Sequence, residues 1–369
     1  MPTIQSFHIQ HFRNLSDVVL TDLGPVNFFW GNNGSGKTSL LEAIYFAGTG
    51  RSFRSSQVQH AIQHHSDGLG LQALILSESD RLQLAVQRRV DGSKQIHWDG
   101  KKIGGFAPIA QALPIQFVST LSYRFFTDGP KIRRQFFDWA MFHVKPTFYK
   151  TWKEWQRLLQ QRNSCLKQRR PRPEVAAWDK PLSELAQVLH EQRLELIDSM
   201  IPILQQHLQL LSAPFDCELD YDRGWESSSA LQHVLEGQIE KDYQLGYTSA
   251  GPQRADFQLL INGMPAVNLL SQGQQKLAMY AMHLAQGYFL RQETGRQPIY
   301  LIDDMASELD PKTQQTILDH LITDLNSQLF LTGITRDVFP ELLPSDAKIH
   351  QLNAGVLTTD VATAEPQSA

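Results

Sequence analysis

The sequence has few cysteines and no long apolar run. Its 369 residues include two cysteines, Cys165 and Cys217, which lie far apart and form no CxxC pair. This usage predicts a reduced, cytosolic compartment. No stretch approaches the roughly 18 consecutive apolar residues that span a bilayer. Residues 1–10 alternate like a strand and lack the basic-then-apolar pattern of a secretory leader, so we expect no membrane segment.

The chain also lacks an excess of positive charge. Its formal net charge is -4, so overall charge does not indicate a nucleic-acid partner, and any DNA-binding surface must be a local patch. Hydrophobic residues make up 41% and charged residues 20%, which is typical of a folded protein. The length fits one large domain with an inserted module.

Strand patterns fill the first third of the chain, and helical patterns fill the middle. The predicted strands cover residues 3–9, 26–30, 71–76, 82–88, 95–98 and 113–118, with a helix over 38–47. From residue 130 to 211 apolar residues recur at helical spacing, and two prolines in segment 168–173 interrupt them. This predicts a helical hairpin with a basic tip. Strands resume near residue 216, and the apolar run 299–302 is typical of a buried parallel strand.

A glycine-rich segment joins the strand at 26–30 to the helix that follows. It fits the pattern G-x-x-x-x-G-K-[ST] in the strand–loop–helix context that a phosphate-binding loop, or P-loop, requires. Its residues are Gly31, Asn32, Asn33, Gly34, Ser35, Gly36, Lys37 and Thr38. Such glycines let backbone N–H groups face an anion, while Lys37 adds charge at the β- and γ-phosphates and the Thr38 hydroxyl ligates Mg²⁺. We therefore expect a site for ATP and Mg²⁺ here.

Two carboxylates follow the apolar strand at 299–302. Asp303 and Asp304 would stand at the carboxyl end of a buried strand, where ligands bind in open α/β sheets. We expect Asp303 to hold Mg²⁺ through water and Asp304 to polarise the attacking water. A strand end capped by solvated acids is the alternative. Residues 307–310 resemble the D-loop of ABC ATPases.

Residues 270–275 resemble the ABC signature L-S-G-G-Q, with Gln272 in place of one glycine. Ser271 and Gly273 stand at the start of an apolar helix predicted over 276–288. A helix amino terminus led by a serine can meet a γ-phosphate. Because the P-loop holds its own nucleotide, the expected target of Ser271 is ATP on a second copy. An ordinary N-cap formed by Ser271 is the alternative.

Together with four further segments, these motifs resemble the RecF family of bacterial recombination ATPases, which are related to SMC heads. The segments are residues 12–15 (FRNL), 50–54 (GRSFR), 129–139 (GPKIRRQFFDW) and 251–256 (GPQRAD). The last usually reads GPHRDD in the family, so Gln253 and Ala255 depart from it.

The expected fold class is α/β, with a P-loop ABC-type ATPase head and an inserted α-helical hairpin lid. The head would combine a mixed sheet, flanking helices and an antiparallel β subdomain. The expected divisions are a first half of the head at residues 1–140, the hairpin at 141–215, the second half of the head at 216–357, and a flexible tail at 358–369.

The resemblance implies a cytoplasmic, nucleoid-associated protein that forms an ATP-dependent homodimer on double-stranded DNA and single-strand/duplex junctions. It implies a weak DNA-stimulated ATPase that helps RecO and RecR to load RecA in gap repair, linked to the SOS response. It also suggests Gln116 as the Q-loop glutamine, whereas from the residues alone Gln116 is only a polar residue in a strand.

Local positive charge gathers in the helical hairpin. Between residues 145 and 172 there are nine Lys or Arg and one acid, Glu154, as expected of a phosphate-binding surface. The residues expected to contact DNA are Arg133, Arg134, Lys167, Arg169, Arg170 and Arg172. A solvated helix face paired with acids of the return helix, among them Glu195, is the alternative.

Three other functions fit parts of this pattern. The nucleotide-binding subunit of a membrane transporter usually has a histidine after the strand that follows the paired acids, and residues 330–335 contain none. An SMC-type structural chromosome protein carries much longer heptad arms. A DNA-binding module with a vestigial ATPase differs from the favoured function only in its lack of ATP turnover.

Overall fold

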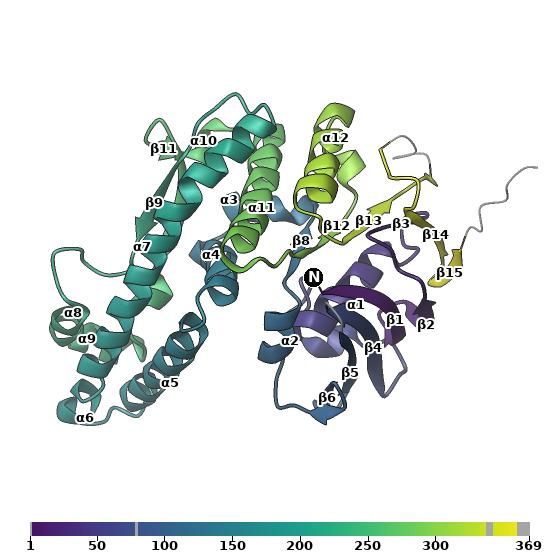
Figure 1. The fold of residues 1–369 in the computed structure, drawn as a ribbon. Helices are drawn as coiled ribbons and strands as arrows, with labels where there is room; N and C mark the ends of the chain where they lie inside the picture. Colours follow the sequence, from purple (N-terminus) through teal and green to yellow (C-terminus); the bar gives the residue numbers. More distant parts are fainter. Residues whose placement is uncertain (1, 78–79, 337–341, 360–369) are drawn as a thin grey trace, which may run out of the picture. The chain divides into compact units, whose positions relative to one another are not determined.

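The computed structural model describes residues 2–77, 80–336 and 342–359. The chain forms two compact units: residues up to 122 together with those from 295 onward make the first, and residues 123–294 make the second (Figure 1). No helix in these described ranges combines the length and apolarity that a membrane crossing needs.

The first unit contains an antiparallel sheet of six strands. In spatial order the strands are β2 (Leu15–Leu20), β1 (Thr3–Phe12), β4 (Gly68–Ser77), β5 (Asp80–Arg89), β6 (Lys94–Trp98) and β7 (Lys101–Lys102). Buried residues alternate along β4 with residues that are half-buried or, at Gln72, exposed, as expected for a sheet with one face in the core. The antiparallel run predicted from residue 71 to 98 is confirmed.

A second sheet in the same unit is parallel except at one edge. Its spatial order is β15 (Val356–Thr359), β14 (Lys348–Asn353), β3 (Val26–Trp30), β13 (Leu329–Gly333), β12 (Ile299–Ile302) and β8 (Ile115–Val118). The neighbours of β3 are β13 and β14, so residues from both ends of the chain build one sheet, as expected.

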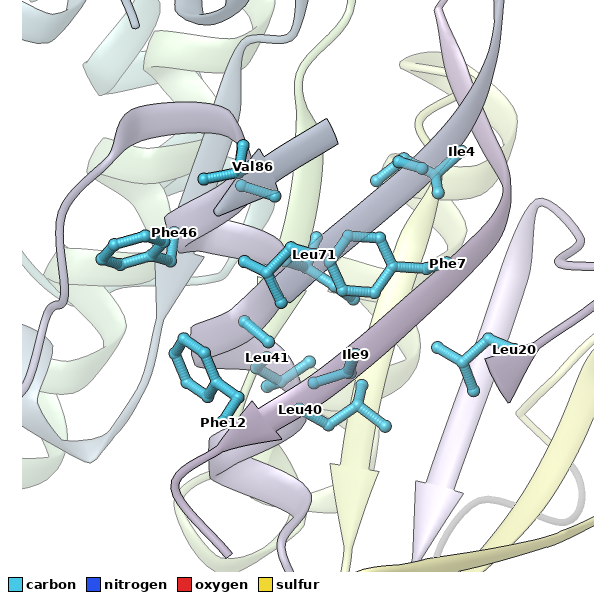
Figure 2. Close-up of a cluster of buried hydrophobic side chains, with 14 of the residues drawn as sticks. Ile4, Phe7, Ile9, Phe12, Leu20, Leu40, Leu41, Phe46, Leu71 and Val86 are labelled. Atoms are coloured by element: carbon cyan, nitrogen blue, oxygen red, sulfur yellow. The ribbon is translucent and has the colours of Figure 1, made fainter. Parts of the chain in front are cut away.

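Helix α1 (Lys37–Thr49) supplies the core of this unit. Its residues Leu40, Leu41 and Phe46 are fully buried, and Figure 2 shows them facing Ile9 and Phe12 of β1. The rings of Phe12 and Phe46 meet edge to face at 5.9 Å. This apolar packing fixes the helix that follows the glycine-rich loop. The other helices of the unit are α2 (Ala107–Ala112) and α12 (Pro311–Asp319), with short turns at Val58–Ala61, Thr120–Tyr123, Met305–Ser307 and His320–Asp324.

The second unit is mainly helical. Its helices are α3 (Arg124–Thr127), α4 (Pro130–Val144), α5 (Phe148–Lys167), α6 (Arg172–Ala176), α7 (Asp179–Leu210), α8 (Leu231–Gly237), α9 (Ile239–Leu245), α10 (Ala266–Leu269) and α11 (Gln272–Thr294). Helices α5 and α7 pack together as the predicted hairpin, and the chain turns between them at the two prolines. A small antiparallel sheet is formed by β9 (Glu218–Asp222), β10 (Asp256–Ile261) and β11 (Met264–Pro265).

The observed division of the chain differs from the expected one. The helical unit begins at residue 123 and ends at 294, whereas the hairpin was expected over 141–215. The reason is that β9, β10 and β11 pair with one another, α4 packs on β10, and α11 packs on α7. Residues 216–294, expected in the head, therefore belong to the helical unit.

The expected flexible tail begins two residues too early. Thr358 lies in β15, and Thr358 pairs with Gln351 of β14. The remainder of that prediction, residues 360–369, lies outside the described residues.

A buried ion cluster joins three segments of the second unit. Arg162 of α5 is fully buried, donates to Asp179 of α7 at 2.7 Å, and donates to Asp242 of α9 at 2.7 Å. It also donates to the Thr248 hydroxyl at 2.9 Å. Arg162, one of the nine basic residues of the hairpin, is therefore structural and unavailable to DNA.

Arg162→Ala should destabilise the second unit by about 3 to 5 kcal/mol, because it leaves two buried carboxylates without their cation. Urea unfolding of the whole chain, followed by circular dichroism, measures this loss. Arg157→Ala on the same helix is the matched control, because Arg157 is exposed and its loss should change stability by less than about 0.5 kcal/mol. Equal stability of the two variants would contradict the structural role of Arg162.

Candidate functional site

The loop between β3 and α1 requires glycine at two positions. A Cβ on Gly31 would lie 2.1 Å from the Leu352 carbonyl oxygen of β14. Gly36, which precedes α1, has a φ of 112°, a conformation that other residues rarely adopt. The residues between them, Asn32, Asn33 and Gly34, are exposed. The sequence thus folds into the strand–loop–helix that its motif predicts.

Lys37 lies in the first turn of α1 and folds back over the loop. Its Nζ donates to the Gly31 carbonyl at 2.5 Å and to the Asn32 carbonyl at 3.1 Å. Burial lowers the pKa of Lys37, and the nearby carboxylates of Asp303 and Asp304 act in the opposite direction. The ammonium group is therefore held against the loop by two carbonyl groups.

Asp303 is held by two hydroxyl groups. Thr38 Oγ1 of α1 donates to its Oδ2 at 2.8 Å, and Thr332 Oγ1 of β13 donates to its Oδ1 at 2.6 Å. The backbone N–H of Asp303 donates to the Val118 carbonyl at 2.9 Å. The carboxylate is consequently fixed beside the loop, as the position of Asp303 at the end of β12 predicts.

Asp304 adopts a left-handed conformation, with a φ of 54°, that ends β12 sharply. Its backbone N–H donates to Thr332 Oγ1 at 3.0 Å, and its carbonyl accepts from the Ser307 hydroxyl at 2.9 Å. Thr332 therefore contacts both acidic residues. It was not predicted, because no motif of the sequence singles it out.

A cleft of about 870 Å³ lies over these residues, within the size range of small-molecule sites. The P-loop and both aspartates line it. Its lining residues also include Arg13, Asn14, Arg54, His60, His64, Thr120 and Ile334. The set is mainly polar and cationic, with the two carboxylates together at one place, which suits a phosphorylated ligand with a divalent cation.

Glu42 of α1 organises the basic residues of the cleft. Its carboxylate is fully buried and accepts from Arg13 through Nη2 at 2.7 Å and through Nε at 3.0 Å. The Ser52 hydroxyl donates to it at 2.5 Å, and Arg54 lies 3.7 Å away. Asn14 donates to the Gly34 carbonyl at 3.1 Å. Arg13 and Asn14 of segment 12–15 and Arg54 of segment 50–54 thus line the cleft, a role that was not predicted for them.

Gln116, the suggested Q-loop glutamine, is not among the residues that line the cleft. It is 3% exposed within β8. The parallel register sets Gln116 opposite Tyr300, whereas Val118 is opposite Ile302, the last residue before Asp303. Gln116 therefore stands well short of the end of the strand where the acids lie. Thr120 is the residue of this segment that lines the cleft.

The signature segment lies in the second unit at the start of α11. Ser271 Oγ accepts from the Gln274 N–H at 3.3 Å, and Gln274 Oε1 accepts from the Ser271 N–H at 2.9 Å. This reciprocal pair is a capping box, so the N-cap alternative describes the single chain. Ser271 and Gly273 are both exposed. Among the described residues, a Cβ on Gly273 would meet nothing within 4 Å, so none of their contacts requires glycine there.

The basic residues expected to contact DNA fall into two groups. Lys167, Arg169, Arg170 and Arg172 are exposed at the turn between α5 and α7. Arg133 instead forms a bidentate pair with Asp256 at 2.7 and 2.9 Å, and Arg134 donates to the Ala255 carbonyl. The packing of α4 on β10 brings both residues to these partners, which removes them from the expected DNA surface. Lys145 pairs with Glu195 at 2.7 Å, as the alternative of paired helix faces predicts.

Comparison with known proteins agrees with this geometry. The family model of the RecF/RecN/SMC N-terminal domain matches residues 3–355. A protein named DNA replication and repair protein RecF from Coxiella burnetii (strain CbuK_Q154) is 42% identical over 90% of this chain and 93% of its own. One of the same name from Vibrio campbellii (strain ATCC BAA-1116) is 38% identical over 94% of this chain and 97% of its own.

Solved structures share the fold. A RecF–ATP structure, described as a recombination mediator protein of the RecFOR pathway, superposes with a TM-score of 0.85 at 23% identity over 97% of both chains. An SMC head bound to the C-terminal winged-helix domain of ScpA gives 0.58 at 15% identity over 96% of both. The fold and the cleft define the class as a P-loop head of the ABC/SMC type. Within that class, the chain belongs to the RecF family.

Thr332→Val should lower ATP turnover by roughly tenfold or more, because the carboxylate of Asp303 loses one of its two anchors and a small displacement is costly. Thr332→Ser should restore turnover, since it keeps the hydroxyl. Steady-state phosphate release measures turnover, and its dependence on Mg²⁺ concentration distinguishes misplacement of Asp303 from general damage. Wild-type turnover and Mg²⁺ dependence in Thr332→Val would contradict this role.

Proposed function

We propose that this protein is an ATP-dependent DNA-binding protein of recombinational repair and replication-gap processing. The proposal rests on one observation: the Thr38 hydroxyl of the P-loop donates a hydrogen bond of 2.8 Å to the Asp303 carboxylate, and Asp304 is the next residue. The proposed role in DNA repair follows from the names of the relatives. The proposed ATP chemistry follows from the residues of the cleft. The activity is a weak, DNA-stimulated ATPase that serves as a switch.

The residues of the cleft suit ATP with Mg²⁺. The P-loop would bind the β- and γ-phosphates through its N–H groups and Lys37. Thr38 and Asp303 would hold Mg²⁺, because a hydroxyl and a carboxylate are the hard oxygen ligands that it prefers. Among the described residues there is no cluster of three His, Cys, Asp or Glu that could hold a metal. When bound, the ion would supply positive charge beside the phosphates.

Asp304 is the proposed catalytic residue. Its carboxylate would orient and polarise the water that attacks the γ-phosphate, and Lys37 would stabilise the negative charge that develops on the phosphate oxygens. Many ABC ATPases have glutamate at this position. The shorter reach of aspartate is consistent with slow turnover.

Asp304→Asn should lower ATP turnover by roughly a hundredfold to ten-thousandfold, because the amide cannot accept the proton of the water. ATP affinity should stay within a few-fold of wild type, since the amide has nearly the same shape. Single-turnover hydrolysis and equilibrium binding of a fluorescent ATP analogue measure the two quantities. Asp319→Asn, an exposed change on α12, is the control.

Undiminished turnover in Asp304→Asn would exclude this residue as the catalytic group. A loss of ATP binding would exclude the proposed division of roles between Asp303 and Asp304. Wild-type protein without any turnover, with or without duplex DNA, would favour a DNA-binding module with a vestigial ATPase.

The ATP switch is proposed to act through a homodimer. Ser271 and Gly273 of one copy would face the triphosphate bound to the P-loop of the other. Glycine inside a helix costs about 0.5 to 1 kcal/mol relative to alanine, and no neighbour in the described part of the chain explains its presence at 273. Close approach of a ligand on a second copy does explain it. ATP then favours the closed dimer because it contacts both copies there.

Ser271→Arg should prevent dimer formation with ATP while leaving ATP binding to the single copy unchanged, because the bulky side chain blocks only the facing surface. Gel filtration with ATP, in the presence and absence of duplex DNA, measures this. Ser228→Arg, in an exposed loop of the same unit, is the matched control. A wild-type protein that stays monomeric under every condition would contradict the shared site.

DNA binding and partner proteins complete the proposal. The exposed cations Lys167, Arg169, Arg170 and Arg172 would bind duplex DNA or single-strand/duplex junctions in the cytoplasm, at the nucleoid. The dimer would work with RecR and RecO in the loading of RecA. Support comes from the exposed basic turn and from relatives that carry the RecF name.

A further inference from the structure

The loop between α9 and β10 runs along α5 toward the basic turn. The Thr248 N–H and hydroxyl both donate to Asn163 of α5, at 2.8 and 2.7 Å. Tyr243 donates to the Arg170 carbonyl at 2.5 Å. Gly246 lies beside the side chain of Lys167. A Cβ added to Gly246 would lie 3.7 Å from the Cγ of Lys167. Residues far apart in sequence therefore share one surface with the basic turn.

This loop presents one arginine on an aromatic ring. The Arg254 guanidinium lies 5.0 Å from the centre of the Tyr247 ring, which is a cation–π distance. Arg254 is exposed, and Tyr247 is 38% exposed. In the described ranges of the chain, no carboxylate forms an ion pair with Arg254. The ring thus holds the cation in a fixed position at the surface.

Other arginines of the same unit behave differently. Arg133, Arg162 and Arg193 each have a carboxylate partner within 2.9 Å, and their side chains are at most 12% exposed. Arg254 and the cations of the basic turn have no such partner among the described residues. The unit therefore neutralises its inner arginines and leaves this outer set available for an anionic ligand.

The outer set forms a strip along α5 rather than a point. Gly251, three residues before Arg254, lies against Trp155, and Gly246 lies against Lys167. Twelve residues of helix separate these two contacts, which is about 18 Å. Duplex DNA carries one negative charge per roughly 1.7 Å of its axis, so a strip of this length spans several phosphates. Glu154 and Glu174 are exposed acids on α5 and α6, and neither forms an ion pair with the strip among the described residues.

We propose that Arg254, held on Tyr247, contacts a backbone phosphate and forms one end of a DNA-binding strip that ends at Arg169, Arg170 and Arg172. This inference rests on the proposed DNA-binding function. A guanidinium presents a rigid fork of N–H donors that matches phosphate oxygens, and stacking on a ring limits the freedom lost on binding. A contact of this kind recognises the backbone and not the base sequence.

The test is duplex affinity of the full chain with ATP, measured by anisotropy of a short labelled duplex over a series of salt concentrations. Arg254→Gln should bind several-fold more weakly at low salt, and the slope of log affinity against log salt should decrease by about one. Arg254→Lys should keep the slope. Tyr247→Leu should weaken binding without a change of slope, and Tyr247→Phe should bind like wild type.

Two references make the result decisive. Lys94→Gln removes an exposed charge from β6 of the first unit and should leave affinity unchanged. Reversal of Arg169, Arg170 and Arg172 to Glu should weaken binding more than Arg254→Gln does, because it removes the other end of the strip. If Arg254→Gln has wild-type duplex affinity and a wild-type salt slope while the triple variant binds weakly, the inference about Arg254 is overturned. The proposed DNA-binding function would stand in that case. A wild-type protein that does not bind duplex DNA would overturn the proposed DNA-binding function as well.

Discussion

The carboxylate of Asp303, held between the hydroxyls of Thr38 and Thr332, is the interaction on which the site depends. It connects α1, β12 and β13, which come from opposite ends of the sequence. Because both carboxylate oxygens accept a hydrogen bond, the side chain has little freedom to rotate away from the P-loop. The same threonine accepts the N–H of Asp304, so the position of one acid determines that of the other. A cleft that binds a triphosphate needs this order before the ligand arrives, since ordering it afterwards would reduce affinity.

The second unit contains two kinds of cation: buried arginines that are paired with carboxylates, and surface cations that are not. In its interior, an arginine is retained only where carboxylates surround it, as Arg162 is by Asp179 and Asp242, because an unpaired buried charge is very costly. At the surface, the cations of the α5–α7 turn and Arg254 have no acid partner in the described ranges. Net charge conceals this difference, since the chain as a whole is at -4. The proposed binding surface for an anion therefore rests on the spatial separation of paired from unpaired cations, and not on their number.

Features that depend on neighbouring residues could be predicted from the sequence. The P-loop, the strand before Asp303 and the proline break in the hairpin are local, because a few residue types determine the backbone there. Features that depend on long-range packing could not be predicted from the sequence. The register of β8 against β12 leaves Gln116 short of the cleft, and Arg133 meets an aspartate 123 positions away. The expected boundary at residue 216 was misplaced because a strand pattern does not reveal which sheet the strand joins. Thr332 was missed because no local motif marks it, and its contacts with Asp303 and Asp304 arise only from strand pairing.

The glycine loop near the amino terminus is braced by residues near the other end of the chain. Strand β3 pairs with β13 and β14, the Leu352 carbonyl packs over Gly31, and the Gly355 N–H donates to the Ser35 carbonyl. During synthesis on the ribosome, the continuous helical unit emerges and can fold before these bracing residues exist. The nucleotide pocket can be completed only after β14 has been synthesised. A polypeptide released before β14 is made therefore carries an intact glycine motif that lacks its bracing strand.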